Sequence, residues 1–146
     1  MSRFARKLLS TRWLIAELAA VLLGLGAFIL PSLFIHTSSS TSLFERCLER
    51  PWPWSILLLI VIGFGVVLAS GLPFWLAGFW STFGLTVLAF IDHATNPAGK
   101  HQLLGLEPVF YLILGVPAML GGIAGTVLRA RAHPDSFDLQ NLWLGG

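Results

Sequence analysis

Residues 53–91 decide the fold, and they read PWSILLLIVIGFGVVLASGLPFWLAGFWSTFGLTVLAFI, with no ionisable side chain. An apolar helix needs about 20 residues to cross roughly 30 Å of hydrocarbon, because each residue rises about 1.5 Å. As one rod, this run would measure almost twice the bilayer thickness. Gly71 and Pro73 divide it near its middle, and they predict a tight antiparallel hairpin of two membrane helices, 53–70 and 73–91.

Two further stretches have the same character. Residues 13–35 are apolar apart from Glu17, and residues 108–128 carry no charge between Glu107 and Arg129. The sequence therefore predicts an all-α integral membrane protein, with four transmembrane helices that form a single membrane domain over residues 1–146.

Composition excludes the other protein classes. Of the 146 residues, 55% are hydrophobic and 11% are charged, against about 25% charged in a soluble domain. The mean hydropathy is +0.80. A water-soluble globule and a disordered chain are excluded, and a single cysteine, Cys47, cannot form a disulfide scaffold. The net charge of +2 lies in membrane-flanking residues, so no nucleic-acid partner is expected.

Basic residues set the expected orientation, because lysine and arginine flanking a membrane helix are retained in the cytoplasm. One face carries Arg3, Arg6, Lys7, Arg12, Arg129 and Arg131, and the other carries Arg46, Arg50 and Lys100. Both termini are therefore expected to be cytoplasmic, in a bacterial inner membrane. The first helix lacks a cleavage pattern and is expected to remain as an anchor.

The segments outside the four spans are also patterned. Ser42 and Glu45 fit a capping box, and residues 43–50 are predicted to form a short amphipathic helix on the outer interface, either as an anchor or as a docking surface. The apolar cytoplasmic tail, 129–146, is expected to lie on the inner interface or in a groove of another subunit.

Three histidines are placed on the outer face: His36, His93 and His101. They are candidate cofactor-binding residues, because with nearby carboxylates they could surround a metal or touch a haem edge. Histidines at helix ends are more often solvated interfacial residues, and no HxxxH or HExxH pattern occurs here. No cofactor is required by the sequence, and contact with haem or a pigment stays open.

Glu17 is the single ionisable residue inside a predicted span. It follows Arg12 by about 7.5 Å of helix, so it is expected near the cytoplasmic face, reaching water or pairing with Arg12, Arg129 or Arg131. The alternative is a proton-coupling carboxylate in a small transporter. No catalytic motif appears, and no enzyme activity is expected.

Small residues recur at four-residue spacing in Ala20 and Gly24, Ala118 and Gly122, and Gly121 and Gly125, a pattern that lets membrane helices approach closely. Pro117 is expected to kink the last helix. Trp75, Phe79 and Phe83 form an aromatic stripe that faces lipid or a neighbouring subunit, or contacts a quinone, carotenoid or chlorin. Gly121, Gly122, Gly125, Trp75, Phe79 and Phe83 are therefore the candidate partner-packing residues.

Residues 7–70 resemble the opening of ResB-type cytochrome c maturation proteins. The matching positions are Ser10, Thr11, Arg12 and Trp13, then Leu30 and Pro31, then Phe44, Arg50, Pro51 and Trp52. The family's large extracytoplasmic domain is absent from this sequence. The resemblance implies haem handling or cytochrome c maturation on the outer face.

The leading hypothesis is a small non-catalytic membrane subunit of a hetero-oligomer. It would sit in the lipid bilayer, pack against other integral membrane subunits, and stabilise or assemble a larger complex, such as a bioenergetic one. Haem handling and Glu17-dependent transport are the two alternatives.

Overall fold

A computed structural model describes residues 11–34, 52–95 and 107–132, and these ranges are helical without any strand. The helices are α2 (Thr11–Phe34), α4 (Trp52–Ser70), α5 (Phe74–Thr95), α6 (Glu107–Leu114) and α7 (Val116–Ala132). Four helical stretches are long and apolar enough to cross a membrane: Thr11–Pro31, Pro53–Ser70, Phe74–Ile91 and Leu112–Ala132. The predicted membrane architecture is confirmed at this level. The interfacial helix expected at 43–50 and the tail beyond residue 132 lie outside the described residues.

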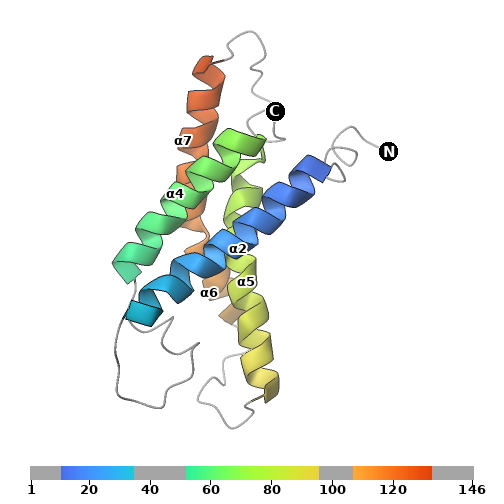
Figure 1. Cartoon of the computed structure of the whole chain (residues 1–146), viewed down its shortest axis with the longest axis vertical. Helices are drawn as coiled ribbons and strands as arrows, with labels where there is room; N and C mark the ends of the chain where they lie inside the picture. The colour runs from blue at the N-terminus through green and yellow to red at the C-terminus, as the bar shows by residue number, and fades with distance from the viewer. Residues whose placement is uncertain (1–10, 35–51, 96–106, 133–146) are drawn as a thin grey trace.

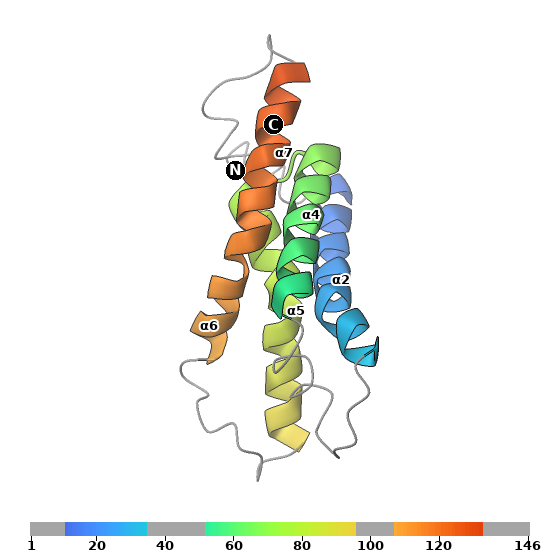
Figure 2. The same ribbon diagram turned by 90° about the vertical axis from the view of Figure 1, so that its left-hand side faces the viewer.

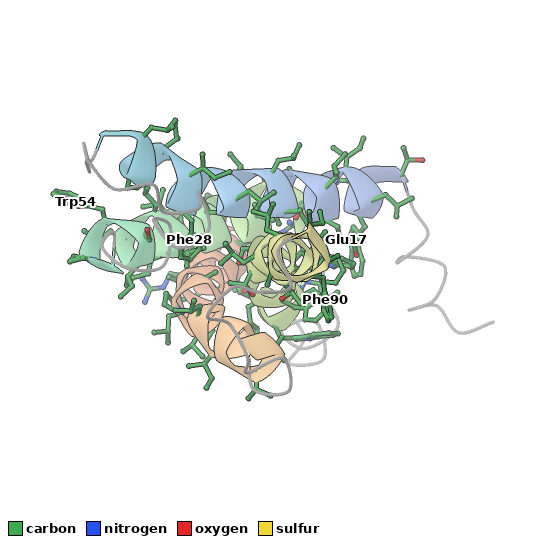
Figure 3. The ribbon with its side chains drawn as sticks, turned by 90° about the horizontal axis from the view of Figure 1, so that it is seen from below. Glu17, Phe28, Trp54 and Phe90 are labelled. Atoms are coloured by element: carbon green, nitrogen blue, oxygen red, sulfur yellow. The ribbon has the colours of Figure 1, made fainter. Side chains whose placement is uncertain are left out.

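The helices form three layers. The α4 and α5 helices occupy the middle, α2 crosses them on one face, and α6 and α7 cover the opposite face (Figures 1 and 3). The α2 helix begins, and α7 ends, at the same end of the bundle (Figure 1). We call this the upper end; at the lower end α2 and α5 finish and α4 and α6 begin (Figures 1 and 2).

The hairpin between α4 and α5 is confirmed. Gly71 has a φ of 70°, a conformation that glycine adopts without the cost of a Cβ. Its N–H donates to the Val67 carbonyl at 2.9 Å, and the Leu72 N–H donates to Ser70 Oγ at 3.1 Å. The link 71–73 is buried, so the turn is part of the packed interior.

The fourth span differs from its prediction. A single helix over 108–128 with a kink at Pro117 was expected; the structure instead breaks it at Gly115 and continues α7 to Ala132. Proline has no N–H, so the carbonyl four residues earlier loses its helical donor and the strain is relieved on the N-terminal side of Pro117. The Gly115 N–H turns back to the Leu112 carbonyl at 3.0 Å, which is the tighter spacing of a 3₁₀ turn.

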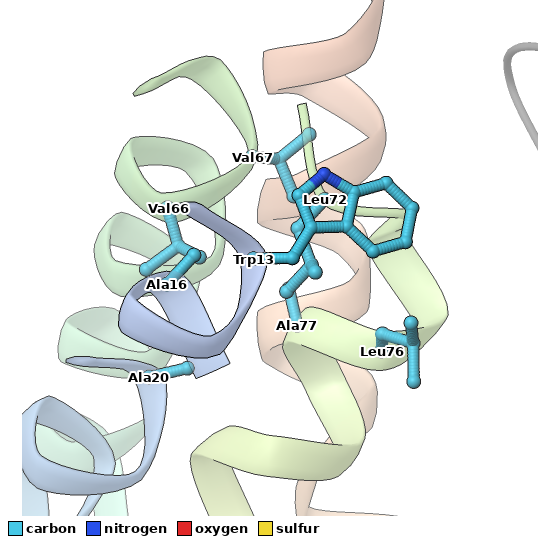
Figure 4. Close-up of a cluster of buried hydrophobic side chains, with 8 residues drawn as sticks. All are labelled: Trp13, Ala16, Ala20, Val66, Val67, Leu72, Leu76 and Ala77. Atoms are coloured by element: carbon cyan, nitrogen blue, oxygen red, sulfur yellow. The ribbon is translucent and has the colours of Figure 1, made fainter. Parts of the chain in front are cut away.

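Two buried clusters hold the layers together. The upper one joins α2, α4 and α5 around Trp13 (Figure 4), and its members are Trp13, Ala16, Ala20, Val66, Val67, Leu72, Leu76 and Ala77. The lower one contains Ala27, Phe28, Leu59, Leu85 and Ala118. Many of these side chains are small, so the helices touch along their backbones rather than across a thick layer of leucines.

Candidate functional site

Helices α4 and α7 meet along a line of glycines, which we call the α4–α7 seam. Three pairs make it: Gly63 on Ala118, Gly121 on Ile60, and Gly125 on Phe64. In each pair, a Cβ on the glycine would collide with the backbone carbonyl oxygen of the partner, at 2.8 Å for Gly125 on Phe64. The glycine therefore directs a Cα–H at that carbonyl, a close helix contact that is typical of membrane interiors.

Glycines also lie at the other helix crossings. Gly24 of α2 lies on the Ser81 carbonyl of α5, and Gly84 of α5 lies on the side chain of Leu25. Gly78 approaches the Gly115 carbonyl, 2.9 Å from where its Cβ would be. This last contact places the break in the fourth span against α5. Sequence spacing identified Gly24, Gly121 and Gly125 but not Gly63, Gly78 or Gly84, because none of the last three has a glycine or an alanine four positions away.

The expected partner-packing glycines are therefore occupied within the chain. Gly121 and Gly125 contact α4, and Gly122 contacts Phe74 of α5 and Val67 of α4. These three positions hold the fold together, and a surface for another subunit has to be sought elsewhere. Gly65 of α4 provides one, because it is exposed and, among the residues that the structure describes, no heavy atom lies within 4 Å of where its Cβ would be.

Glu17 lies on the side of α2 that faces α5 (Figure 3), with 9% of its surface exposed. Its Oε1 atom is buried and makes no hydrogen bond within the described residues. The expected pairing with arginine is not observed there. Arg12 instead donates from Nη2 to the Ala69 carbonyl at 2.9 Å, at the C-terminal end of α4, where a cation is favourable. Arg129 keeps a buried Nη1 atom without a partner in the same ranges.

Trp80 is the polar neighbour of Glu17. Its indole lies beside the carboxyl, yet its Nε1 is buried and makes no hydrogen bond of acceptable geometry within the described residues. The ring also contacts Phe79 and Phe83, with centroid distances of 5.2 Å and 5.1 Å and nearly perpendicular planes. Trp80 is not part of the stripe predicted from four-residue spacing, and that spacing does not reveal that its indole faces Glu17.

The predicted stripe lies at the edge of this cluster. Trp75 and Phe83 are exposed, and Phe79 is half-buried. Phe79 and Phe83 contact each other at 5.6 Å between ring centroids. The stripe thus connects the half-buried indole of Trp80 with the outer surface of α5, where lipid or a partner would touch it.

The hydroxyl groups of the bundle bond to backbone carbonyls. Ser55 of α4 donates to the Ala27 carbonyl of α2 at 2.9 Å. Ser70, Ser81 and Thr126 each bond a carbonyl in the preceding turn of their own helix. These groups are satisfied by the fold, and the buried polar atoms that lack a bond within the described residues belong to Glu17, Trp80 and Arg129.

The expected outer-face histidines are not brought together by any observation. His36 and His101 lie outside the described residues, as does the side chain of His93 near the end of α5. Among the described side chains, no group of three His, Cys, Asp or Glu residues gathers as a metal site. Comparison with protein-family models, curated proteins and solved structures gives no match. The resemblance to ResB-type proteins therefore stays a prediction.

Proposed function

We propose that this protein is a small non-catalytic subunit of a larger membrane complex, in which it packs against other integral membrane proteins and stabilises or assembles them. We place it in a bacterial inner membrane, within a complex of the bioenergetic kind. Gly65 on the outer face of α4 is the observation that carries this proposal.

Gly65 breaks the pattern of its helix. Each other glycine described on α4, α5 and α7 lies against a neighbouring helix, whereas Gly65 faces open space. Ala69 is exposed four residues later, so the pair forms a small-xxx-small surface on which no described residue contacts Gly65. Such a surface favours close approach of another membrane helix, because two backbones can touch without intervening side chains.

The surroundings of Gly65 indicate what would pack there. Val61 is 65% exposed, and Leu58 and Leu68 are exposed as well. A glycine in a helix costs about 1 kcal/mol relative to alanine, and no contact from residues 11–34, 52–95 or 107–132 offsets that cost at this position. An apolar helix from another subunit would offset it through van der Waals contact and Cα–H contacts to its carbonyls.

The experiment compares two small-to-large variants on exposed faces. In Gly65→Leu the new side chain fills the open surface of α4, and in Ala124→Leu the same kind of change is made on the exposed face of α7. Both variants are purified from native membranes in a gentle detergent, and co-purifying membrane proteins are quantified by mass spectrometry. We expect the wild type and Ala124→Leu to retain the same stoichiometric partner and Gly65→Leu to lose it.

A photo-crosslinking residue at position 61 provides the second measurement. It should join the chain to that partner in native membranes. A partner recovered equally with Gly65→Leu would contradict the proposal, and so would a lone monomer in every sample. Cross-links between two copies of this chain would replace the hetero-oligomer with a homo-oligomer.

The alternatives have weaker support. Haem handling depends on residues outside the described ranges. A transporter needs Glu17 in a water-filled cavity between protomers, whereas Glu17 lies between α2 and α5 of one chain.

A further inference from the structure

Arg129 is a half-buried cation at the upper end of the bundle. It lies in the last turn of α7, and its Nη1 atom is buried and makes no hydrogen bond within residues 11–34, 52–95 and 107–132. A guanidinium group carries five N–H donors and keeps its charge in proteins. Removing part of that charge from water is costly unless an anion or an acceptor compensates it. Arg129 therefore needs a partner that the described part of the chain does not supply.

The position of Arg129 on α7 places it on the packed face of that helix. Each residue turns a helix by about 100°, so Arg129 returns to within about 20° of Ala118, which is fully buried. Arg131 lies about 200° further round and is exposed. Two arginines of one helical turn thus differ in their surroundings: Arg129 continues the packed face, and Arg131 lies on the outer face.

The α4–α7 seam determines which part of the bundle Arg129 meets. Gly125, one turn earlier, lies against the Phe64 carbonyl of α4. Arg129 therefore lies level with the last turn of α4, which ends at Ser70. Arg12 of α2 also lies at this end of α4, but its Nη2 already donates to a backbone carbonyl there. Of these two guanidinium groups, the one on α7 is the one without a bonded partner among the described residues.

The described charges are unevenly distributed between the two ends of the bundle. All three arginines of the described ranges lie at the upper end, where α2 begins and α7 ends. Asp92 and Glu107 belong to the lower end, close to the end of α5 and at the start of α6. Glu17 is the remaining carboxylate in these ranges, and it lies on the side of α2 that faces α5, away from α7. The excess of positive charge at the upper end favours an anion as the partner of Arg129.

The surface beside Arg129 indicates which anion. Val127 and Leu128 are 42% and 47% exposed, and they belong to a helix long and apolar enough to cross a membrane. An anionic phospholipid offers a phosphate to the guanidinium and acyl chains to the apolar surface next to it, whereas a free phosphate ion offers only the first. Basic groups between membrane helices bind anionic headgroups, and arginine matches the geometry of a phosphate with two parallel N–H bonds.

We propose that Arg129 binds the phosphate of an anionic phospholipid at the upper end of α7, beside the end of α4. The headgroup lies on the surface of the bundle and meets the half-buried guanidinium from the membrane surface, so the site needs no internal cavity. A lipid can bind to a single chain, and the site does not include Gly65. Failure of this proposal and failure of the partner surface on α4 are therefore separate results.

The test titrates the full chain, in micelles of an uncharged detergent, with phosphatidylglycerol whose acyl chains carry bromine and quench tryptophan fluorescence. Phosphatidylcholine with the same brominated chains has no net charge, so it gives the quenching that follows from partition into the micelle alone. The excess quenching by phosphatidylglycerol measures occupancy of the site. Titrations are made in about 0.1 M and about 1 M sodium chloride, where exposed charges are screened beyond about 10 Å and about 3 Å.

Arg129→Gln and Arg131→Gln form a matched pair, because each removes one positive charge from the same turn of α7. We expect Arg129→Gln to bind phosphatidylglycerol about tenfold less tightly at both salt concentrations, since a hydrogen bond between charged groups is lost. Arg131→Gln should weaken binding by at most about fivefold in the lower salt and have no effect in the higher salt.

Circular dichroism checks that each variant is folded. Arg129→Lys provides a second comparison, because it keeps the charge but not the paired N–H donors. It should bind more tightly than Arg129→Gln and less tightly than the wild type, and binding equal to that of Arg129→Gln would contradict a role for the charge.

Three results would overturn the proposal. Equal losses in Arg129→Gln and Arg131→Gln at both salt concentrations would show a diffuse attraction to the membrane surface instead of a site. Displacement of the lipid by inorganic phosphate, beyond the effect of chloride at equal ionic strength, would assign the site to a free ion. Equal loss of stability in lipid-free micelles for Arg129→Gln and for the double variant Asp135→Asn/Asp138→Asn would show that the chain's own carboxylates hold the arginine.

Discussion

Replacing Gly121 with alanine should destabilise the bundle, although alanine is the better helix former. A Cβ at Gly121 would overlap the carbonyl oxygen of Ile60 and also stand 2.8 Å from its carbonyl carbon, whereas ordinary contact begins at 3.4 Å. The α4 and α7 helices therefore have to move apart to admit it. The obstacle is backbone, which cannot turn aside as a flexible side chain can. Overpacking of this kind costs about 1–3 kcal/mol, because contacts along the whole α4–α7 seam are loosened with it.

Gly65→Ala is the matched control. It makes the same chemical change on α4, where a Cβ would meet nothing within 4 Å. Both variants gain about 1 kcal/mol of helix propensity. The difference between their free energies of unfolding therefore gives the cost of placing a Cβ in the α4–α7 seam. We expect Gly121→Ala to be less stable than Gly65→Ala by about 1–3 kcal/mol.

The measurement is equilibrium unfolding of the purified chain in mixed micelles, in which the fraction of sodium dodecyl sulfate is raised and loss of structure is followed by circular dichroism and tryptophan fluorescence. Gly65→Ala should unfold at or above the wild-type midpoint, and Gly121→Ala below it. If the two variants unfold at the same midpoint, the glycines of α7 do not hold the seam and the reasoning about backbone contact is wrong.

Three further predictions use other parts of the bundle. Ser55→Ala removes the bond to the Ala27 carbonyl and should lower the free energy of unfolding by about 0.6 kcal/mol, up to about 1.7, in the same micelle titration; no loss would show that α2 and α4 do not depend on this bond. Glu17→Leu keeps the volume but removes an unsatisfied buried acceptor, so it should raise the unfolding midpoint by the equivalent of about 1–3 kcal/mol; a less stable variant would mean that Glu17 has a partner in the folded chain. Reporter fusions test the orientation: a fluorescent protein fused after residue 146 should fluoresce, and alkaline phosphatase fused there should be inactive, whereas the reverse pattern would place the termini outside.

The membrane spans were predictable because they depend only on properties that can be read along the sequence. Length and the absence of charge define residues 53–70 and 73–91, and the structure places helices at Trp52–Ser70 and Phe74–Thr95. The turn at Gly71 follows from the same local chemistry. The break in the fourth span was only partly predictable: Pro117 signals a disturbance, but its position at Gly115 depends on how closely that residue packs on Gly78.

The candidate site was less predictable than the spans, because it depends on which helix faces meet. Glu17 stood out in the sequence as an ionisable group in an apolar helix, yet its distance from Arg12 indicated an arginine partner. The structure points Arg12 at the end of α4 and Glu17 at Trp80. Similarly, spacing gave Gly121 and Gly125 a role in close packing, but it contained nothing to say that the contacted helix is α4 of the same chain.

The buried turn between α4 and α5 bears on how the protein is made. Leu72 is 1% exposed and Pro73 is among the most fully buried side chains. The link of residues 71–73 is therefore short and packed, and it has no charged residue to hold it at the membrane surface. The insertion machinery would therefore have to release the two helices into lipid as a unit, with their relative register already set by Gly71. The last helix, synthesised afterwards, would then meet a ready-made row of carbonyls on α4, so the order of synthesis and the order of packing coincide.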